Sequence, residues 1–204
     1  INAIPWEHFG LPPASLLDLF SNTPDKVTAF ISTLLKISRS YQLSKESFYN
    51  PALRSYQDLQ DNYFEETEEA VKKFRETYKW KEILPVDLVS LESVLTKMGI
   101  QVNRKRMGGM ESLKELRSYY SRDNKILFIN KLLSTAQEKF LLGREIAFQF
   151  MNITPRPYET IIQHSDSFDM LLNNFKASYF SVALLMPEEN FVEDVKRIVM
   201  QPKW

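Results

Sequence analysis

The sequence predicts an α+β fold that is mainly helical. We expect an N-terminal helical arm over residues 1–62, followed by a domain over residues 63–204 in which a small antiparallel sheet packs on helices. Two observations support this division. Apolar residues recur at helical spacing up to about Tyr78, and strand formers replace that pattern between Ile100 and Asn130 before helical spacing returns.

The arm contains breaks at Pro12-Pro13, Thr23-Pro24 and Asn50-Pro51. After Pro24 an apolar stripe recurs at spacings of three and four residues, formed by Val27, Phe30, Ile31, Leu34, Leu35 and Ile37. Such a stripe is typical of a helix that packs against a partner helix. The helix that follows Pro51 is strongly acidic up to Lys72, and we interpret this acidic stretch as a solvated face.

The following domain contains a helix predicted over Val86 to Lys97, with Gly99 at the place of a helix C-cap. Three stretches rich in strand formers come next: Ile100 to Met107, Lys114 to Ser121 and Lys125 to Asn130. Arg122-Asp123-Asn124 indicates a hairpin turn between the last two. Three helices complete the prediction: one from the N-cap Ser134 to about Met151, then Phe168 to Leu185 and Pro187 to Met200.

The composition excludes several kinds of chemistry. The chain has no cysteine, which rules out disulfides, thiolate zinc sites, iron–sulfur clusters and a cysteine nucleophile. Its formal net charge is zero, so the overall charge does not favour binding to nucleic acid or to an acidic membrane. No apolar run of about 18 residues and no signal peptide is visible. We therefore expect a cytoplasmic protein with no membrane partner.

Two helices place charge among apolar residues. The predicted helix between Phe140 and Met151 is apolar nearly all round, and its only charged residues are Arg144 and Glu145. The helix that begins at Phe168 likewise surrounds Lys176 with apolar residues. A charge in such a place is costly unless it is paired or faces a polar cavity. These three charged residues therefore predict either a small buried ion network or a binding site.

Both helices carry stretches that resemble the motifs of the ImmA/IrrE family of zincin-like metallopeptidases. The first family motif has the form H-E-x-x-H, and the second reads E-A-N-x-F-A-x-x-L-L-M-P. Here the corresponding stretches are REIAF, which begins at Arg144, and KASYFSVALLMP, which begins at Lys176. The resemblance covers about residues 63 to 200 and implies a zincin-like fold. In the family two histidines four residues apart bind zinc, the intervening glutamate is the general base, and the acid that begins the second motif is the third ligand.

The resemblance also implies that the metal site is degenerate. Arg144 and Phe148 stand at the two histidine positions and Lys176 at that of the acid, while Glu145 remains at the position of the general base. Neither arginine nor lysine is a zinc ligand at neutral pH. The chain has only two histidines, and neither lies within the two motifs. We therefore expect no zinc, no catalytic residue and no enzymatic activity.

The stretch STAQEKFLLGREIAFQF is similar to one branch of this family, the C-terminal part of the bacterial short-chain fatty-acyl-CoA regulators of the helix-turn-helix XRE class. In that branch a DNA-binding domain and a helical linker precede the degenerate zincin-like domain. The beginning of this chain, IPWEHFGLPPASLLDLFSNTP, resembles that linker. The resemblance implies that DNA is bound through a domain outside this chain and that the effector is a small acyl-coenzyme A.

An anionic effector needs cationic neighbours, and its acyl part needs apolar ones. The candidate ligand-binding residues are Arg144, Lys176, Tyr179, Arg117, Tyr119 and Arg106. The cations could donate charge-assisted hydrogen bonds to phosphate or carboxylate, and the tyrosines could line an acyl pocket. Alternatively, the basic strands form a charged, exposed sheet edge and the aromatic residues belong to the core.

The sequence is compatible with three functions. The first is an effector-sensing region of a DNA-binding regulator, in which the ligand shifts the arrangement of the helical arm. The second is a protein-interaction and dimerisation module, in which the stripe from Val27 to Ile37 forms the interface of a homodimer. The third is a residual metallopeptidase that uses Glu145.

Overall fold

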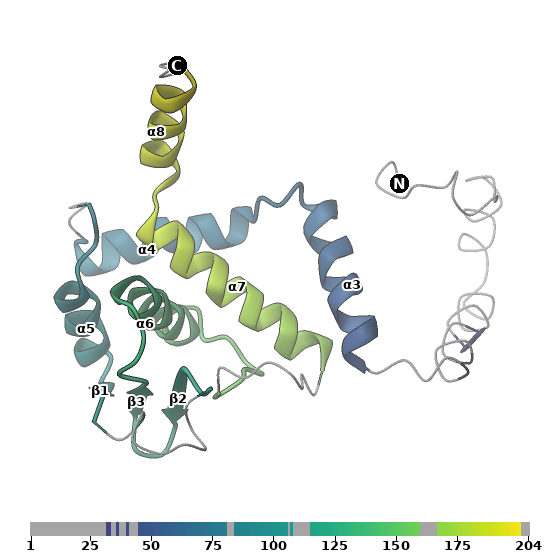
Figure 1. The fold of residues 1–204 in the computed structure, drawn as a ribbon, viewed down its shortest axis with the longest axis horizontal. Coiled ribbons are helices and arrows are strands. Elements are labelled where there is room, and N and C mark those ends of the chain that lie inside the picture. The colour runs from purple at the N-terminus through teal and green to yellow at the C-terminus, as the bar shows by residue number, and fades with distance from the viewer. Residues whose placement is uncertain are drawn as a thin grey trace. The chain divides into compact units, whose positions relative to one another are not determined.

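The computed structural model describes residues 45–80, 84–105, 107, 115–159 and 167–200, and before them only Ser32, Thr33, Lys36 and Ser40, all helical. The chain divides into two compact units, Ile1–Tyr63 and Phe64–Trp204. Helix α3, Lys45–Leu59, belongs to the first unit (Figure 1). The stripe predicted from Val27 to Ile37 falls almost entirely outside the described residues, so its interface role stays a prediction.

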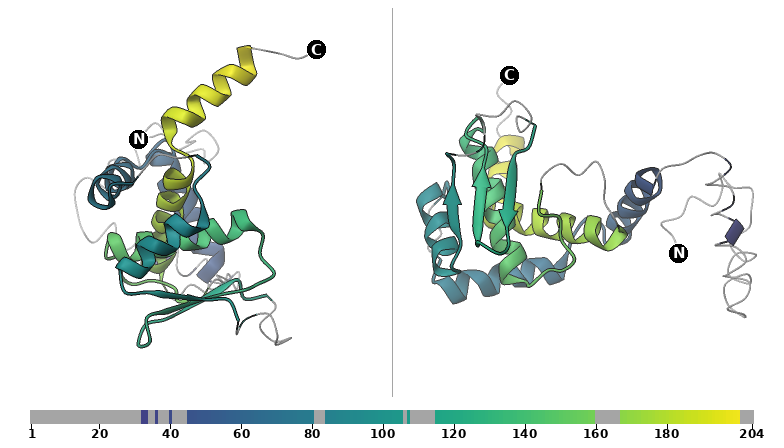
Figure 2. Two further views of the ribbon diagram at one scale, coloured as in Figure 1. Left: turned by 90° about the vertical axis from the view of Figure 1, so that its left-hand side faces the viewer. Right: turned by 90° about the horizontal axis from the view of Figure 1, so that it is seen from below.

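The second unit contains five described helices and three described strands (Figure 1). The helices are α4 (Glu65–Tyr78), α5 (Leu88–Lys97), α6 (Thr135–Phe150), α7 (Phe168–Leu185) and α8 (Glu188–Met200), and the strands are β1 (Gln101–Asn103), β2 (Ser118–Ser121) and β3 (Ile126–Ile129). Helix α6 packs against both α5 and α7, and α4 packs against α7. Figure 2 shows the sheet on one side of these helices. The predicted class, α+β and mainly helical, is confirmed.

The sheet is mixed, and the expectation of a wholly antiparallel sheet is corrected. Strands β2 and β3 form the predicted antiparallel hairpin, in which Tyr119 lies opposite Phe128. Strand β1 pairs with the other edge of β3 in parallel, so the order is β1-β3-β2. The turn between β2 and β3 is encoded by adjacent residues, whereas the neighbour of β1 is fixed by long-range packing.

Local signals set the ends of the helices. The side chain of Ser134 accepts a hydrogen bond from the backbone N–H of Gln137, whose side chain in turn accepts from the backbone N–H of Ser134, which is a capping box. After α5, the N–H of Ile100 donates to the carbonyl of Leu95 and that of Gly99 to Thr96. Gly99 has φ +79°, the left-handed conformation that ends a helix in this way.

One hydrophobic core joins α4, α5, α6, α7 and the sheet. Its fully buried members include Phe74, Leu91, Leu95, Ile100, Ile129, Leu142, Ile146, Phe180 and Leu184. This core makes α6 a central helix, because Leu141 to Phe148 are buried without interruption. No helix in the described part of the chain combines the length and the hydropathy needed to cross a membrane.

Candidate functional site

The candidate site lies on helix α6, in the interior of the second unit. This helix approaches α7 closely at Gly143, where an added Cβ would lie 2.4 Å from the Oγ of Ser181. That hydroxyl donates to the carbonyl of Phe140 over 2.8 Å and ties the two helices together. Since α6 is buried over more than two turns, its charged side chains must find partners inside the protein.

Glu145 is paired with Arg156, a residue of the loop that follows α6. The guanidinium Nη1 lies 2.8 Å from Oε1 and Nη2 lies 2.5 Å from Oε2, which is a two-bond, end-on ion pair. Gln149 Nε2 also donates to Oε1 over 2.7 Å. The side chains of Glu145 and Arg156 are only 3% and 8% exposed. Both oxygens of the carboxylate at the general-base position are therefore engaged by the chain's own side chains.

Three aromatic rings surround the guanidinium of Arg156. Its Cζ lies 3.9 Å from the ring centre of Phe148, 4.9 Å from that of Tyr120 and 5.4 Å from that of Tyr158. Such contacts favour a cation that has been removed from water. Burial, and after it the charge of Glu145, raises the pKa of the Tyr120 hydroxyl. We call these five residues, Tyr120, Glu145, Phe148, Arg156 and Tyr158, the Arg156 box.

Arg144 is also buried, but its partners are neutral. It donates to Asn174 Oδ1 on α7 over 3.3 Å and to Ser118 Oγ on β2 over 3.5 Å. Burial lowers the pKa of Arg144 to about 10, so the side chain stays cationic at neutral pH. Among the described residues the buried charged side chains are Arg144, Glu145 and Arg156. Two cations and one anion leave this interior with one excess positive charge.

Lys176 does not join this cluster, so one of the two expected alternatives, a buried ion network of Arg144, Glu145 and Lys176, does not form with all three members. Its Nζ binds Glu66 Oε2 of α4 over 2.9 Å, and its side chain is 21% exposed. Residues two apart in a helix point in nearly opposite directions, so the α7 residue that faces Arg144 is Asn174. We therefore infer that Asn174, two residues before Lys176, is the α7 side chain that faces the first ligand position, at Arg144.

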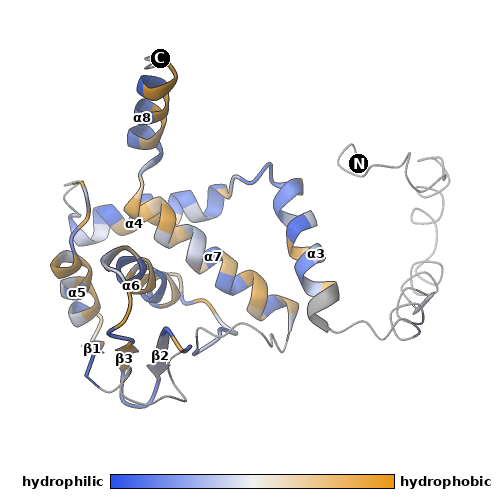
Figure 3. Ribbon diagram, in the orientation of Figure 1, coloured by the Kyte–Doolittle hydropathy of each residue, from blue (hydrophilic) through white to orange (hydrophobic). Residues whose placement is uncertain are grey.

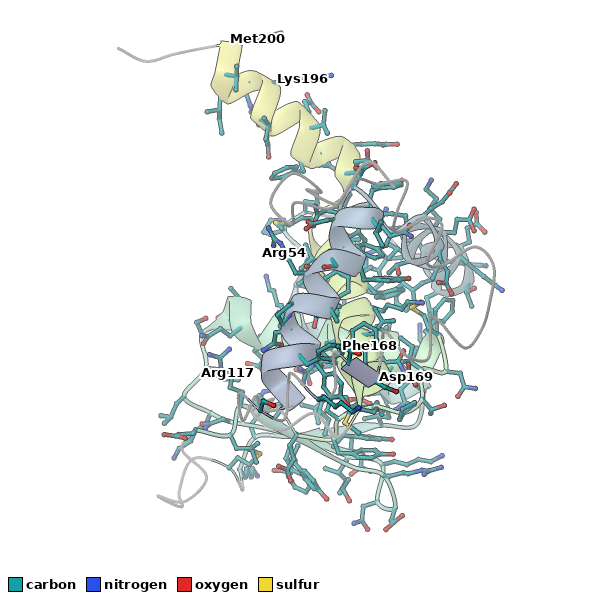
Figure 4. All side chains as sticks on the ribbon, turned by 90° about the vertical axis from the view of Figure 1, so that its right-hand side faces the viewer. Arg54, Arg117, Phe168, Asp169, Lys196 and Met200 are labelled. Carbon is teal, nitrogen blue, oxygen red and sulfur yellow. The ribbon has the colours of Figure 1, made fainter. Side chains whose placement is uncertain are left out.

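The other candidate ligand residues lie in separate places. Tyr179 turns toward α4, where its hydroxyl donates to Glu68 Oε1 over 2.9 Å. Tyr119 stacks on Phe128 on the exposed face of the sheet, because it alternates with the buried Ser118 and Tyr120. Arg117, labelled in Figure 4, lines a cavity of about 270 Å³ with four residues of α6. Arg106 lies outside the described residues. Tyr119 and Tyr179 are thus assigned to surface and inter-helix packing rather than to one acyl pocket.

The side chains at the ligand positions do not fit a zinc ion. Zinc in such a site takes imidazole nitrogens and carboxylate oxygens. The corresponding positions here hold the guanidinium of Arg144, the benzyl group of Phe148 and the amide of Asn174, whose oxygen already accepts from Arg144. In the described ranges no three His, Cys, Asp or Glu side chains come together as a metal site. The chain keeps the scaffold of a zinc site with a donor set that zinc does not use.

Comparison with known families agrees with this scaffold. The family model for the IrrE N-terminal-like domain, Peptidase_M78, matches residues 95–199, which is just over half of the chain. The chain belongs to this family. The match runs from the end of α5 to α8, so the IrrE N-terminal-like domain includes the sheet and both helices of the site.

A solved structure also shares the fold of this IrrE N-terminal-like domain. It is a Mycobacterium tuberculosis transcriptional regulator with a TM-score of 0.56 and 18% sequence identity. The match covers 72% of this chain and 44% of that regulator, so the chain corresponds to less than half of the regulator's length. No curated protein sequence matches the chain.

Sequence reasoning missed three residues of the site, Arg156, Asn174 and Ser118. Arg156 stands between two prolines in a segment that composition assigns to a polar loop, so nothing local marks it as buried. A signal was present nonetheless, because the buried carboxylate of Glu145 requires a cationic partner. Arg144 is a poor candidate for this partner, since neighbouring residues on a helix do not face each other.

Proposed function

We propose that this IrrE N-terminal-like domain is a catalytically inactive, effector-sensing region of a transcriptional regulator, and that it recognises a small anion at Arg144. The observation that carries the proposal is the pairing of Glu145 with Arg156 beside a second buried arginine. The likeness of the fold to a protein described as a transcriptional regulator supports the regulatory part.

The state of Glu145 supports the absence of peptidase activity. A metallopeptidase needs this carboxylate to accept a proton from a metal-bound water. In this chain both of its oxygens accept hydrogen bonds from Arg156, and Gln149 adds a third. The residues at the ligand positions bring no imidazole nitrogen, thiolate sulfur or free carboxylate oxygen for a metal. Residual hydrolysis by Glu145 is therefore a poor fit to the site.

The excess charge supports recognition of an anion. Arg144 lies 7% exposed and is bonded by neutral oxygens at 3.3 and 3.5 Å, longer than usual charge-assisted bonds. A phosphate or carboxylate oxygen would replace these contacts by shorter ones and neutralise the remaining cation. The same step would offset the desolvation that lowers the pKa of Arg144.

The resemblance to acyl-coenzyme A regulators makes a small acyl-coenzyme A the effector that we propose. It carries phosphates for a cationic site and an acyl chain for an apolar one. Binding would act on DNA through a domain outside this chain, because the effector favours one arrangement of the helical arm over another. That arm is the segment up to residue 62, and a homodimer would place two DNA-binding heads at a defined spacing.

A thermal-shift titration tests the proposal. Acetyl-, propionyl- and butyryl-coenzyme A are compared with free coenzyme A and inorganic phosphate, all up to millimolar concentration. At a free ligand concentration of about 100 times Kd, a ligand stabilises the folded state by about 2.7 kcal/mol, which raises Tm by roughly 5–10 °C for a chain of this size. An acyl-coenzyme A should give such a shift and phosphate alone a smaller one.

Two arginine variants control this experiment. Arg144→Met should abolish the ligand-induced shift, because it removes the buried cation. Arg122→Met, in the exposed turn between β2 and β3, should leave the shift unchanged. If no anion in the panel stabilises the native chain, or if Arg144→Met responds as the native chain does, the proposed recognition at Arg144 is wrong.

A further inference from the structure

Helix α8 exposes an apolar face that the described part of the chain does not cover. None of its thirteen residues is buried. Ile198 and Val199 are each 71% exposed and Phe191 is 55% exposed, although large apolar residues are normally shielded. Figure 3 shows hydrophobic colouring along one side of α8 and hydrophilic colouring along the other.

The apolar residues of α8 form one continuous stripe. Phe191, Val192, Val195, Ile198 and Val199 recur at i, i+1, i+4, i+7 and i+8, which places them on a single side of the helix. This is the pattern of a helix that packs against another helix along its whole length. A stripe of this kind needs a partner, since it is too ordered in spacing to be scattered surface residues.

The charges on α8 indicate what that partner is. The first half carries four acidic residues, Glu188, Glu189, Glu193 and Asp194, and the second half carries Lys196 and Arg197. Figure 4 marks this second half with Lys196 and Met200. The segregation also suits the dipole of the helix itself, so the charges alone do not require a partner. They do decide which direction of pairing is favourable.

We propose that α8 is a self-association helix that pairs antiparallel with α8 of a second copy of this chain. In that arrangement the acidic half of each helix lies beside the basic half of the other, and the two apolar stripes meet around Val195. A parallel pair would place the acidic halves together and the basic halves together, which is unfavourable. The pair is isologous and closes by two-fold symmetry. This interface is independent of the effector site proposed above.

The expected association is weak and reversible. A contact between two helices of this length is smaller than the roughly 1,200–2,000 Å² buried by stable interfaces, so we expect a Kd on the order of 0.1 mM. Sedimentation velocity of the full chain between 10 µM and 1 mM measures it. The weight-average mass should rise from monomer toward dimer across this range.

A matched pair of variants locates the interface. Val195→Glu should weaken dimerisation at least tenfold, because it places a carboxylate at the centre of the stripe. Val89→Glu makes the same change at a 77% exposed position of α5 and should dimerise as the native chain does. Since Val195 and Val89 are both exposed, both variants should keep the native circular dichroism spectrum and Tm.

Cysteine cross-linking tests the direction of pairing, and the chain offers a background free of cysteine. A mixture of Phe191→Cys and Val199→Cys chains should form a covalent heterodimer on oxidation, because the two positions lie on the stripe and opposite each other in an antiparallel pair centred on Val195. Val199→Cys alone should not cross-link, because its two copies lie roughly 12 Å apart along such a pair. A chain that stays monomeric at 1 mM, an equally dimeric Val195→Glu variant, or cross-linking of Val199→Cys alone would each overturn the proposal.

Discussion

Removal of Arg156 should destabilise the protein far more than removal of a half-buried arginine that also binds carboxylates. The change we consider is Arg156→Met, which keeps most of the apolar volume inside the Arg156 box and deletes the cation. It leaves the carboxylate of Glu145, 3% exposed, without its two charge-assisted hydrogen bonds. The assay is urea denaturation of the full chain, followed by circular dichroism at neutral pH.

The magnitude follows from the burial of the pair. Breaking a buried ion pair by removing one partner costs about 3–5 kcal/mol, because the remaining charge stays desolvated. The lost contact with the rings of Phe148, Tyr120 and Tyr158 adds a smaller amount, which methionine partly replaces. Replacement of both charges, in Glu145→Gln with Arg156→Met, should bring the free energy of unfolding back to within about 2 kcal/mol of the native value.

Arg104 supplies the matched control. It binds Glu92 and Glu138, but its side chain is 35% exposed, so Arg104→Met should cost about 1 kcal/mol or less. A thermodynamic cycle compares the native chain with Glu145→Gln, with Arg156→Met and with the variant that carries both changes. We expect a coupling of about 3 kcal/mol between Glu145 and Arg156. Equal destabilisation by Arg156→Met and Arg104→Met, or additive effects of Glu145→Gln and Arg156→Met, would show that the buried pair is not coupled.

Three further predictions concern the same helices. Arg144→Met should leave stability unchanged or raise it by up to about 3 kcal/mol at pH 7, since burial lowers the pKa of Arg144 to about 10. Above pH 10, Arg144 of the native chain keeps its proton in the unfolded state but loses it in the folded state, so the free energy of unfolding of the native chain rises with pH. The advantage of Arg144→Met should therefore shrink when the urea midpoints of both chains are measured from pH 9 to pH 11. Gly143→Ala should destabilise the chain by about 1–3 kcal/mol through its clash with Ser181, and added Ser181→Ala should recover part of the loss in thermal denaturation. A zinc site should be restored by Arg144→His, Phe148→His and Asn174→Glu together, in a chain that also carries Arg156→Ala, and calorimetry should detect zinc binding. The same chain with Lys176→Glu instead of Asn174→Glu should not bind zinc.

The helices of the second unit could be predicted closely from sequence because their signals are local. Ser134 begins α6 as an N-cap, α7 has the predicted bounds of Phe168 and Leu185, and Gly99 follows α5 in the left-handed conformation. The hairpin of β2 and β3 follows from the residues of its turn. The parallel pairing of β1 could not be predicted, because no residue of that strand encodes its neighbour.

The site was predictable in part. The burial of Arg144, Glu145 and Phe148 followed from the apolar character of α6. The assignment of Lys176 to the third ligand position stays a prediction. In the structure Asn174, and not Lys176, lies beside Arg144, which a motif alignment could not indicate because it gives an order of residues and not the side of the helix on which each lies. The acidic start of α4 is largely solvated as predicted, with the side chain of Glu66 75% exposed. The prediction did not include the contacts of Glu66 and Glu68 with Lys176 and Tyr179 across the helix pair. Such pairings appear only when two helices distant in sequence are packed together.

If this zincin-like scaffold recognises a ligand without holding a catalytic metal, the native chain should not retain zinc. Elemental analysis of the native chain, after incubation with excess zinc and removal of free metal, measures this. We expect zinc far below one ion per chain and the same Tm before and after chelation. One tightly held zinc ion per chain, whose removal lowers Tm, would show that the scaffold still holds a metal.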